Sequence, residues 1–160
     1  MARRKKAAVP LRKTEVRRHS RPVIDLGPLN GHLGYFVRRA QIWIFQDFIR
    51  KLAAIDVSPA QFSVLVVISA NSGLSQAELA ATLGIERARL VRMLHILEDR
   101  GLTQRSPSVA DGRRHELRLT RDGQKLLAQA KTLAGQHEAA LQSRLGAEKY
   151  KLLLDALHNF

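Results

Sequence analysis

The chain has 160 residues, which suits one domain with a substantial hydrophobic core, and it contains no cysteine, which excludes disulfides and thiol catalysis. Its 27 Lys and Arg against 14 Asp and Glu give a net charge of +13, and such an excess favours a polyanionic partner, nucleic acid before an anionic membrane surface. No apolar run approaches the length of a membrane span, and the basic N-terminus lacks the apolar segment of a secretory signal. We therefore expect a cytoplasmic protein without a membrane partner.

Residues 1–28 are expected to form a basic, flexible arm. Residues 1–24 hold nine basic side chains and one acidic one, and Pro10, Pro22 and Pro28 interrupt any helix. Three roles stay open for this arm: a solvated tail, a segment that tracks DNA phosphates, or a source of arginines that hold the phosphates of an anionic ligand.

A helical pattern covers about residues 29–55. Its main apolar stripe consists of Leu33, Phe36, Val37, Ala40, Ile44, Phe48 and Leu52. Ile42, Trp43, Phe45 and Ile49 lie off that stripe, although a surface helix needs only one apolar face. This helix is therefore expected to pack in the core and in a dimer interface, or to line an apolar ligand cavity beside Arg38 or Arg39.

The next helices are predicted from their caps. Ser58, Pro59 and Gln61 have the pattern of a helix start, and so do Ser75 and Glu78. Leu79, Ala80 and Leu83 precede Gly84, and a second apolar face follows it and ends before Gly101. Two short helices across a glycine turn indicate a helix-turn-helix.

The outward residues of this unit are cationic near the start of its second helix, the end that a recognition helix presents to base edges. A solvated basic face on an ordinary helical hairpin is the alternative. The residues expected to contact DNA here are Ser75, Gln76, Arg87, Ala88, Arg89, Arg92 and His95.

After Gly101 the apolar period changes from 3.6 to 2, which predicts a strand at 102–105, a polar loop at 106–112 and a second strand at 115–120. A hairpin directly after a recognition helix is a wing. Arg113 and Arg114 lie at its tip, where arginine suits a narrow minor groove, or they are solvated loop residues.

Two amphipathic helices are expected after Thr120, separated at Gly146. They have too little core of their own to cover, so we expect them to pack against the same helices of a second copy. Such a homodimer places two recognition helices in successive major grooves, about 34 to 36 Å apart, on a palindromic site of double-stranded DNA.

The segment DGRRHELRLT at 111–120 fits the D-x-R-x-x-x-L-x-L-T wing motif of the MarR family of bacterial regulators, and Gly123 follows as in its T-x-x-G. LGIERARLVRMLHILEDRGL also resembles the family's recognition helix. The resemblance covers about residues 30–160 and leaves the basic arm unexplained, since most family members lack one. It implies that Asp111 pairs with Arg113 to shape the wing, and that a homodimeric repressor leaves DNA when a small molecule, often aromatic, binds.

The resemblance places the ligand between the dimerisation helices and the winged domain. Some relatives respond to aromatic acyl-CoA thioesters, whose phosphates would suit nearby arginines. The residues expected to line this cleft or its rim are Phe36, Arg38, Arg39, Ala40, Trp43, Phe62 and Val66.

We thus expect a mainly α fold with a small β-wing: an arm at 1–28 and a MarR-like domain at 29–160. In that domain a winged helix-turn-helix at about 58–120 lies between dimerisation helices at about 29–55 and 121–160. No catalytic motif or metal-ligand spacing is present, so we expect neither an enzyme nor a cofactor, although metal sensing across a dimer stays open. The alternative function is an architectural DNA-binding protein without a ligand switch.

Overall fold

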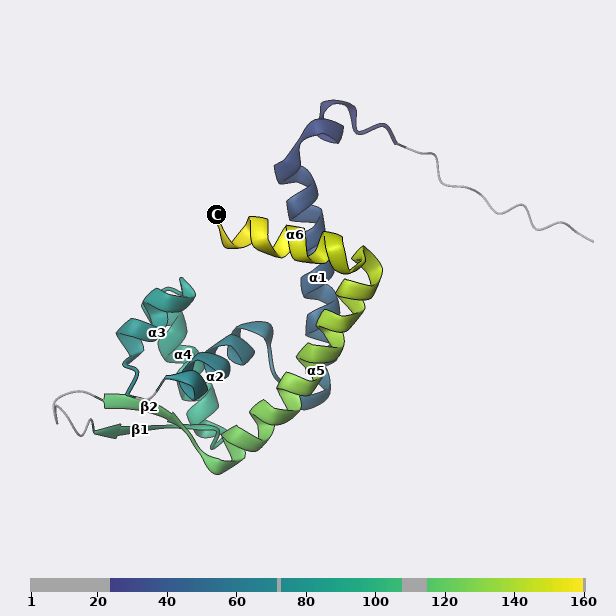
Figure 1. Cartoon of the computed structure of the whole chain (residues 1–160). Helices are drawn as coiled ribbons and strands as arrows, with labels where there is room; N and C mark the ends of the chain where they lie inside the picture. The colour runs from purple at the N-terminus through teal and green to yellow at the C-terminus, as the bar shows by residue number, and fades with distance from the viewer. Residues whose placement is uncertain (1–23, 72, 108–114, 160) are drawn as a thin grey trace, which may run out of the picture.

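The computed structural model describes residues 24–71, 73–107 and 115–159. Two long helices, α1 (Leu33–Leu52) and α5 (Arg121–Leu145), lie side by side, and α6 (Ala147–His158) doubles back from the end of α5 (Figure 1). A second lobe contains α2 (Pro59–Ala70), α3 (Gln76–Leu83), α4 (Arg87–Asp99) and an antiparallel hairpin of β1 (Thr103–Pro107) and β2 (His115–Leu119). The predicted fold class, mainly helical with a small wing, is confirmed.

The first helix is shorter than the sequence indicated. The predicted span of about 29–55 divides into a 3-10 helix η1 (Gly27–Gly31), α1, and a second 3-10 helix η2 (Ala53–Ile55). Gly31 ends η1 beside an extended His32, and Asp56 ends η2 in the left-handed region at φ 51°. The apolar period alone suggested a single α-helix, but both ends of the predicted span form short 3-10 helices instead.

The main core lies inside the second lobe, where α2, α3, α4, the hairpin and the start of α5 meet. Its fully buried leucines include Leu65, Leu79, Leu90 and Leu94. A smaller cluster of Leu52, Val57 and Ala130 joins α1 to α5. Burial of a leucine side chain stabilises a fold by about 1.5–3 kcal/mol, so the two clusters together fix α4 relative to the long helices.

Both helices of the helix-turn-helix end as the sequence predicted. Ser75 and Glu78 form a complete capping box at the start of α3. At its end Gly84 has φ 61°, and Ile85 N donates to Ala80 O at 3.0 Å. At the end of α4, Leu102 N donates to Leu97 O at 2.9 Å and Gly101 N to Glu98 O at 2.8 Å, the bonds of a Schellman motif. These glycines turn the chain where a side chain would be strained.

The wing is longer than predicted at its first strand. Ser106 and Pro107, which the sequence analysis assigned to the loop, pair with Glu116 and His115 in β1 and β2. Proline is tolerated there because this strand end needs no further N–H donor. Leu117 is buried, as the alternation predicted, and its N–H donates to Leu74 O at 2.9 Å, so β2 is also tied to the start of α3.

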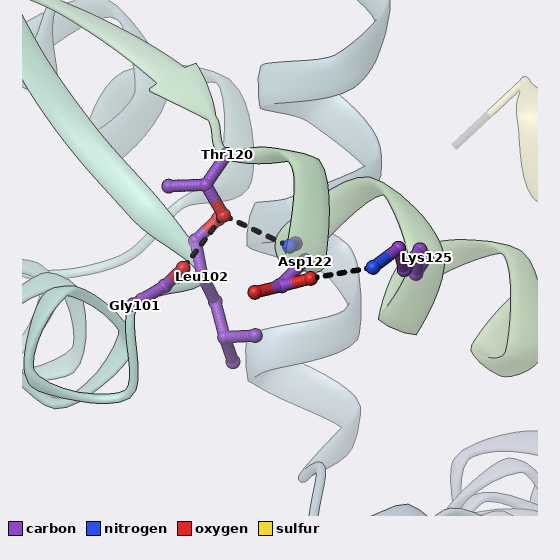
Figure 2. Close-up of polar contacts among 6 residues, drawn as sticks. Gly101, Leu102, Thr120, Asp122 and Lys125 are labelled. Carbon is purple, nitrogen blue, oxygen red and sulfur yellow. Dashed lines mark hydrogen bonds and ion pairs between the residues drawn. The ribbon is translucent and has the colours of Figure 1, made fainter.

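Thr120 joins the wing to both neighbouring helices (Figure 2). Its hydroxyl donates to Gly101 O at 2.6 Å and accepts from Gly123 N at 3.0 Å, while its own N–H donates to Leu102 O at 3.1 Å. The residue therefore caps α5 and at the same time holds the exit of α4.

Replacing Thr120 by valine is expected to lower the free energy of unfolding by about 1–2 kcal/mol, because it removes a helix cap and leaves a carbonyl without its donor. Urea unfolding followed by circular dichroism measures this loss. Thr132→Val is the matched control, since Thr132 is exposed on α5 and its hydroxyl bonds only to Ala128 O of its own helix. Equal losses in the two variants would contradict the capping role.

Within the described residues, no single helix is both long and apolar enough to cross a membrane. One pair of neighbouring helical segments, Leu33–Ile55 and Pro59–Ala70, is long and apolar enough when the two are counted together, but the pair is bent by 72°.

Candidate nucleic-acid interface and ligand cavities

One face of α4 is exposed and basic. The side chains on this face are Arg87, Ala88, Arg89, Arg92 and His95, and all of them are exposed. The opposite face carries Leu90, Met93, Leu94 and Leu97, all buried. Because the buried face fixes the rotation of the helix, the cations point away from the lobe, where a duplex could reach them.

Ser75 and Gln76 lie at the start of α3, and the side chains of both form hydrogen bonds within the protein. The Ser75 hydroxyl donates to Glu78 Oε2 at 2.6 Å and accepts from Glu78 N at 3.3 Å. With its amide oxygen turned toward Arg105, Gln76 accepts from Nε at 3.1 Å and from Nη2 at 3.2 Å. Arg105 Nε also lies 2.8 Å from Glu98 Oε1.

Arg105 and Glu98 were not singled out by the sequence analysis. Together with Gln76 they connect the start of α3, the end of α4 and the base of the wing. Asp111, Arg113 and Arg114, the predicted wing residues, lie outside the described residues.

The first cavity, here the outer cavity, has a volume of about 490 Å³ and lies among α1, α5 and α6. Its lining residues are Phe36, Arg39, Ala40, Trp43, Ile44, Leu141, Arg144, Leu145 and Leu153. The Arg144 guanidinium lies over the Trp43 ring, 4.3 Å from its centroid. Four of the predicted ligand residues therefore lie together on an apolar surface that carries two arginines.

The second cavity, here the inner cavity, has a volume of about 390 Å³ and lies between the long helices and the helix-turn-helix. Its lining residues are Ile44, Phe45, Phe48, Pro59, Ala60, Ser63, Leu83, Ile85, His137 and Glu138. Both volumes are within the range of about 300–1,000 Å³ that is typical of ligand sites. The two cavities share Ile44, so they adjoin at α1.

Three predicted ligand residues line neither cavity. Phe62 and Val66 instead pack against the core clusters, Phe62 with its ring edge-on to Phe48 at 5.5 Å between centroids. Arg38 is exposed on α1. Helical spacing placed Phe62 and Val66 on an inward face correctly, but it did not distinguish core from cavity wall.

A polar pair between α1 and α5, formed by a buried histidine and a half-buried aspartate, was also missed. His137 is only 2% exposed, and its Nδ1 lies 2.8 Å from Asp47 Oδ2. The hydrogen bond from His137, aided by Arg50 at 3.1 Å, holds the pKa of the Asp47 carboxyl below its ordinary value, although burial acts in the opposite direction. His137 follows Leu133 and precedes Leu141 by four residues, so the helical period did carry a signal for its burial.

Large apolar side chains are exposed on α1 and α6. They are Leu33, Phe36, Val37, Ile42, Trp43, Phe45 and Ile49 on α1, and Leu152, Leu153, Leu154 and Leu157 on α6. Exposed apolar surface on this scale is typical of an interaction site.

Comparison with known sequences places the chain among transcriptional regulators. A family model described as the MarR family matches residues 55–114. A Thauera aromatica protein, proposed as the transcriptional regulatory protein for the hcr operon, is 34% identical over 129 residues, which cover 79% of this chain and 78% of that protein. The transcriptional regulator HosA of Escherichia coli is 32% identical over 99 residues, which cover 62% of this chain and 73% of that protein.

Solved structures show the same likeness. The transcriptional repressor CouR bound to a 23-mer DNA duplex matches with a TM-score of 0.81 and 44% identity, over 86% of this chain and 97% of that chain. CouR bound to p-coumaroyl-CoA matches with a TM-score of 0.77 and 43% identity, over 85% and 96%. Wild-type MarR from E. coli in its apo form matches with a TM-score of 0.69 and 27% identity, over 80% and 96%.

Proposed function

Because this chain belongs to the MarR family of DNA-binding transcriptional regulators, we propose that it is a homodimeric repressor that leaves a palindromic operator when an aromatic acyl-CoA thioester binds. The observation that carries the DNA-binding part is the exposed face of α4, with Arg87, Arg89 and Arg92 on one side of a well-packed helix. Arginine at such a position bonds guanine edges in the major groove.

The exposed apolar faces of α1 and α6 support the dimer. A single copy leaves Trp43, Phe45 and Leu157 each at least 40% exposed. A second copy that covers these faces removes this surface from water, and it pairs the two α4 helices as a palindromic site requires. The structure of CouR bound to a 23-mer DNA duplex supports a complex of this chain with double-stranded DNA.

The charges around the two cavities favour a thioester over a free aromatic acid. Among the described residues that line the inner cavity there is no lysine or arginine, and Glu138 is there instead. The carboxylate of a free acid would therefore meet a like charge, whereas the thioester end of an acyl-CoA is uncharged.

The outer cavity supplies the cations that the inner cavity lacks. Arg39 and Arg144 line it, and phosphate is a good partner for the planar guanidinium group. An acyl-CoA would place its aromatic ring in the inner cavity and its phosphates toward these arginines. The solved complex of CouR with p-coumaroyl-CoA supports a ligand of this class.

A ligand in the inner cavity would touch the DNA-reading unit directly. The cavity is lined by Leu83, the last residue of α3, and by Ile85, which lies in the turn between α3 and α4. From the other end of α4, Arg100 donates to Asp56 O at 2.6 Å and thereby connects the helix to the segment after α1. We expect ligand binding to shift α4 relative to its dimer partner and so to lower operator affinity.

An architectural DNA-binding protein without a ligand switch is the second candidate. The basic segment at 1–24 favours it, because its charge could supply most of the affinity for any DNA. If a variant that lacks residues 1–24 loses all preference for its operator over random DNA at moderate salt, the architectural function is favoured. Since the relatives are transcriptional regulators, we propose no enzymatic activity for either candidate.

The deciding experiment first selects an operator from random duplexes and then measures its affinity by fluorescence anisotropy. Addition of p-coumaroyl-CoA is expected to weaken operator binding at least tenfold, while p-coumarate and CoA alone have little effect. The same thioester should raise the melting temperature, since it binds the native state. Stabilisation without DNA release would contradict the proposed repressor switch, and release by the free acid would contradict the proposed ligand class.

A further inference from the structure

The His137 ring is held in one orientation at the wall of the inner cavity. Its Nδ1 lies 2.8 Å from Asp47 Oδ2, and the ring stacks on Phe48 with 5.0 Å between centroids and 20° between planes. One edge of the imidazole therefore bonds to Asp47, and the stack on Phe48 restricts rotation of the ring.

This arrangement determines which nitrogen carries the proton in the neutral ring. Asp47 stays ionised at neutral pH, since its bonds to His137 and Arg50 keep the pKa of its carboxyl low. A carboxylate only accepts hydrogen bonds, so Nδ1 must donate. Nε2 is then left with a lone pair, and no described residue forms a hydrogen bond with it.

Each of the other two polar side chains that line the inner cavity has at least one hydrogen-bond partner. The Ser63 hydroxyl donates to Pro59 O at 3.1 Å, and Glu138 Oε2 accepts from the Tyr150 hydroxyl at 2.6 Å, a bond that raises the pKa of Tyr150. The remaining lining is aliphatic, aromatic or proline. In its neutral form, the His137 ring therefore offers Nε2 as an acceptor that no described residue fills, at the wall of a largely apolar cavity where a hydrogen bond has a large effect on affinity.

We propose that His137, oriented by Asp47, is a specificity-determining residue that selects ligands whose aromatic ring carries a hydroxyl group. The ligand O–H donates to Nε2, and an analogue without that hydroxyl leaves the nitrogen buried and unsatisfied, which costs affinity. This inference rests on the proposed function, because it requires the ring of the ligand to enter the inner cavity.

The test compares p-coumaroyl-CoA with cinnamoyl-CoA, which differ only in the ring hydroxyl, by isothermal titration of the full chain. The wild-type protein is expected to bind the hydroxylated thioester about tenfold more tightly or better. His137→Phe keeps an aromatic ring against Phe48 but has no acceptor, so the ratio of the two affinities should fall to near one. His158→Phe makes the same change at an exposed histidine of α6 and should keep the wild-type ratio.

The outcomes separate this inference from the proposed function. If p-coumaroyl-CoA releases the operator but the wild-type protein binds both thioesters equally, the role of His137 is wrong while the repressor function stands. If neither thioester binds, the ligand class is wrong and the selection by His137 falls with it. Should His137→Phe fail to fold, equal affinities of the wild-type protein for the two thioesters still overturn the inference.

Discussion

Gly123→Ala is expected to destabilise the fold strongly, although alanine is the better helix former. A Cβ at residue 123 would lie 1.9 Å from the carbonyl oxygen of Leu102, and this neighbour is backbone that also accepts the N–H of Thr120. The start of α5 would have to move away from the exit of α4. The contact explains why the first turn of α5 needs glycine at this position, beside the capping bond shown in Figure 2.

The expected loss of stability in Gly123→Ala is the difference between two opposing effects. Alanine in a helix gains about 1 kcal/mol over glycine, whereas overpacking against a rigid neighbour costs about 1–3 kcal/mol and occasionally more. Because a 1.9 Å approach to backbone is among the severest overlaps, we expect a net loss of about 2 kcal/mol or more. For a chain of this size the melting temperature should fall by roughly 4–8 °C.

Gly135→Ala is the matched control, in the same helix. A Cβ at Gly135 would meet nothing within 4 Å, so the substitution should stabilise α5 slightly. Thermal unfolding by calorimetry measures both variants. If Gly123→Ala were as stable as wild type, the backbone at Leu102 could move away from α5 at little cost. That result would contradict a rigid contact between Leu102 and the first turn of α5.

Local signals in the sequence predicted the helix-turn-helix well. Ser75, Glu78, Gly84 and Gly101 act through bonds to residues at most five positions away, so their effect is visible in a short window of sequence. The same holds for Thr120, whose cap begins α5. The order of elements and the exposed face of α4 then follow from the apolar period.

The ligand cavities could be predicted only in part, because they depend on how distant helices pack. Phe36, Arg39, Ala40 and Trp43 share a helix face, and the structure indeed brings them together. Arg144 and His137 line the cavities from α5, which follows α1 about 100 residues later in the chain. The spacing of residues within one helix cannot predict a contact between helices so far apart in sequence.

A histidine or an aspartate on the apolar stripe of a helix could have predicted a polar contact between helices. Asp47 lies three residues after Ile44 and His137 four residues after Leu133, so each falls on its helix's buried side. A buried polar residue needs a partner. The partner's identity, however, depends on the α1 and α5 packing, which only the fold provides.

Arg89→Ala and Arg92→Ala are each expected to weaken operator binding about 5- to 150-fold, the range expected when an arginine contact worth about 1–3 kcal/mol is lost. Both side chains are exposed on α4, and the helix beneath them is fixed by Leu90 and Met93, so truncation should not disturb the fold. Footprinting and anisotropy on the selected operator measure the loss. Gln129→Ala, exposed on α5, should leave protection unchanged.

A charge-matched control separates base reading from simple attraction. Lys131→Ala removes one positive charge from an exposed position on α5, so a loss due to overall charge alone should appear there as well. An arginine on a base edge instead relaxes base preference at one position, whereas an arginine on phosphate weakens all sequences equally and lowers the salt slope by about one. Repeating the selection with each variant assigns Arg89 and Arg92 to one contact or the other. Unchanged protection by both variants would contradict base reading by Arg89 and Arg92, and it would leave Arg87, Ala88 and His95 as the remaining exposed candidates on α4.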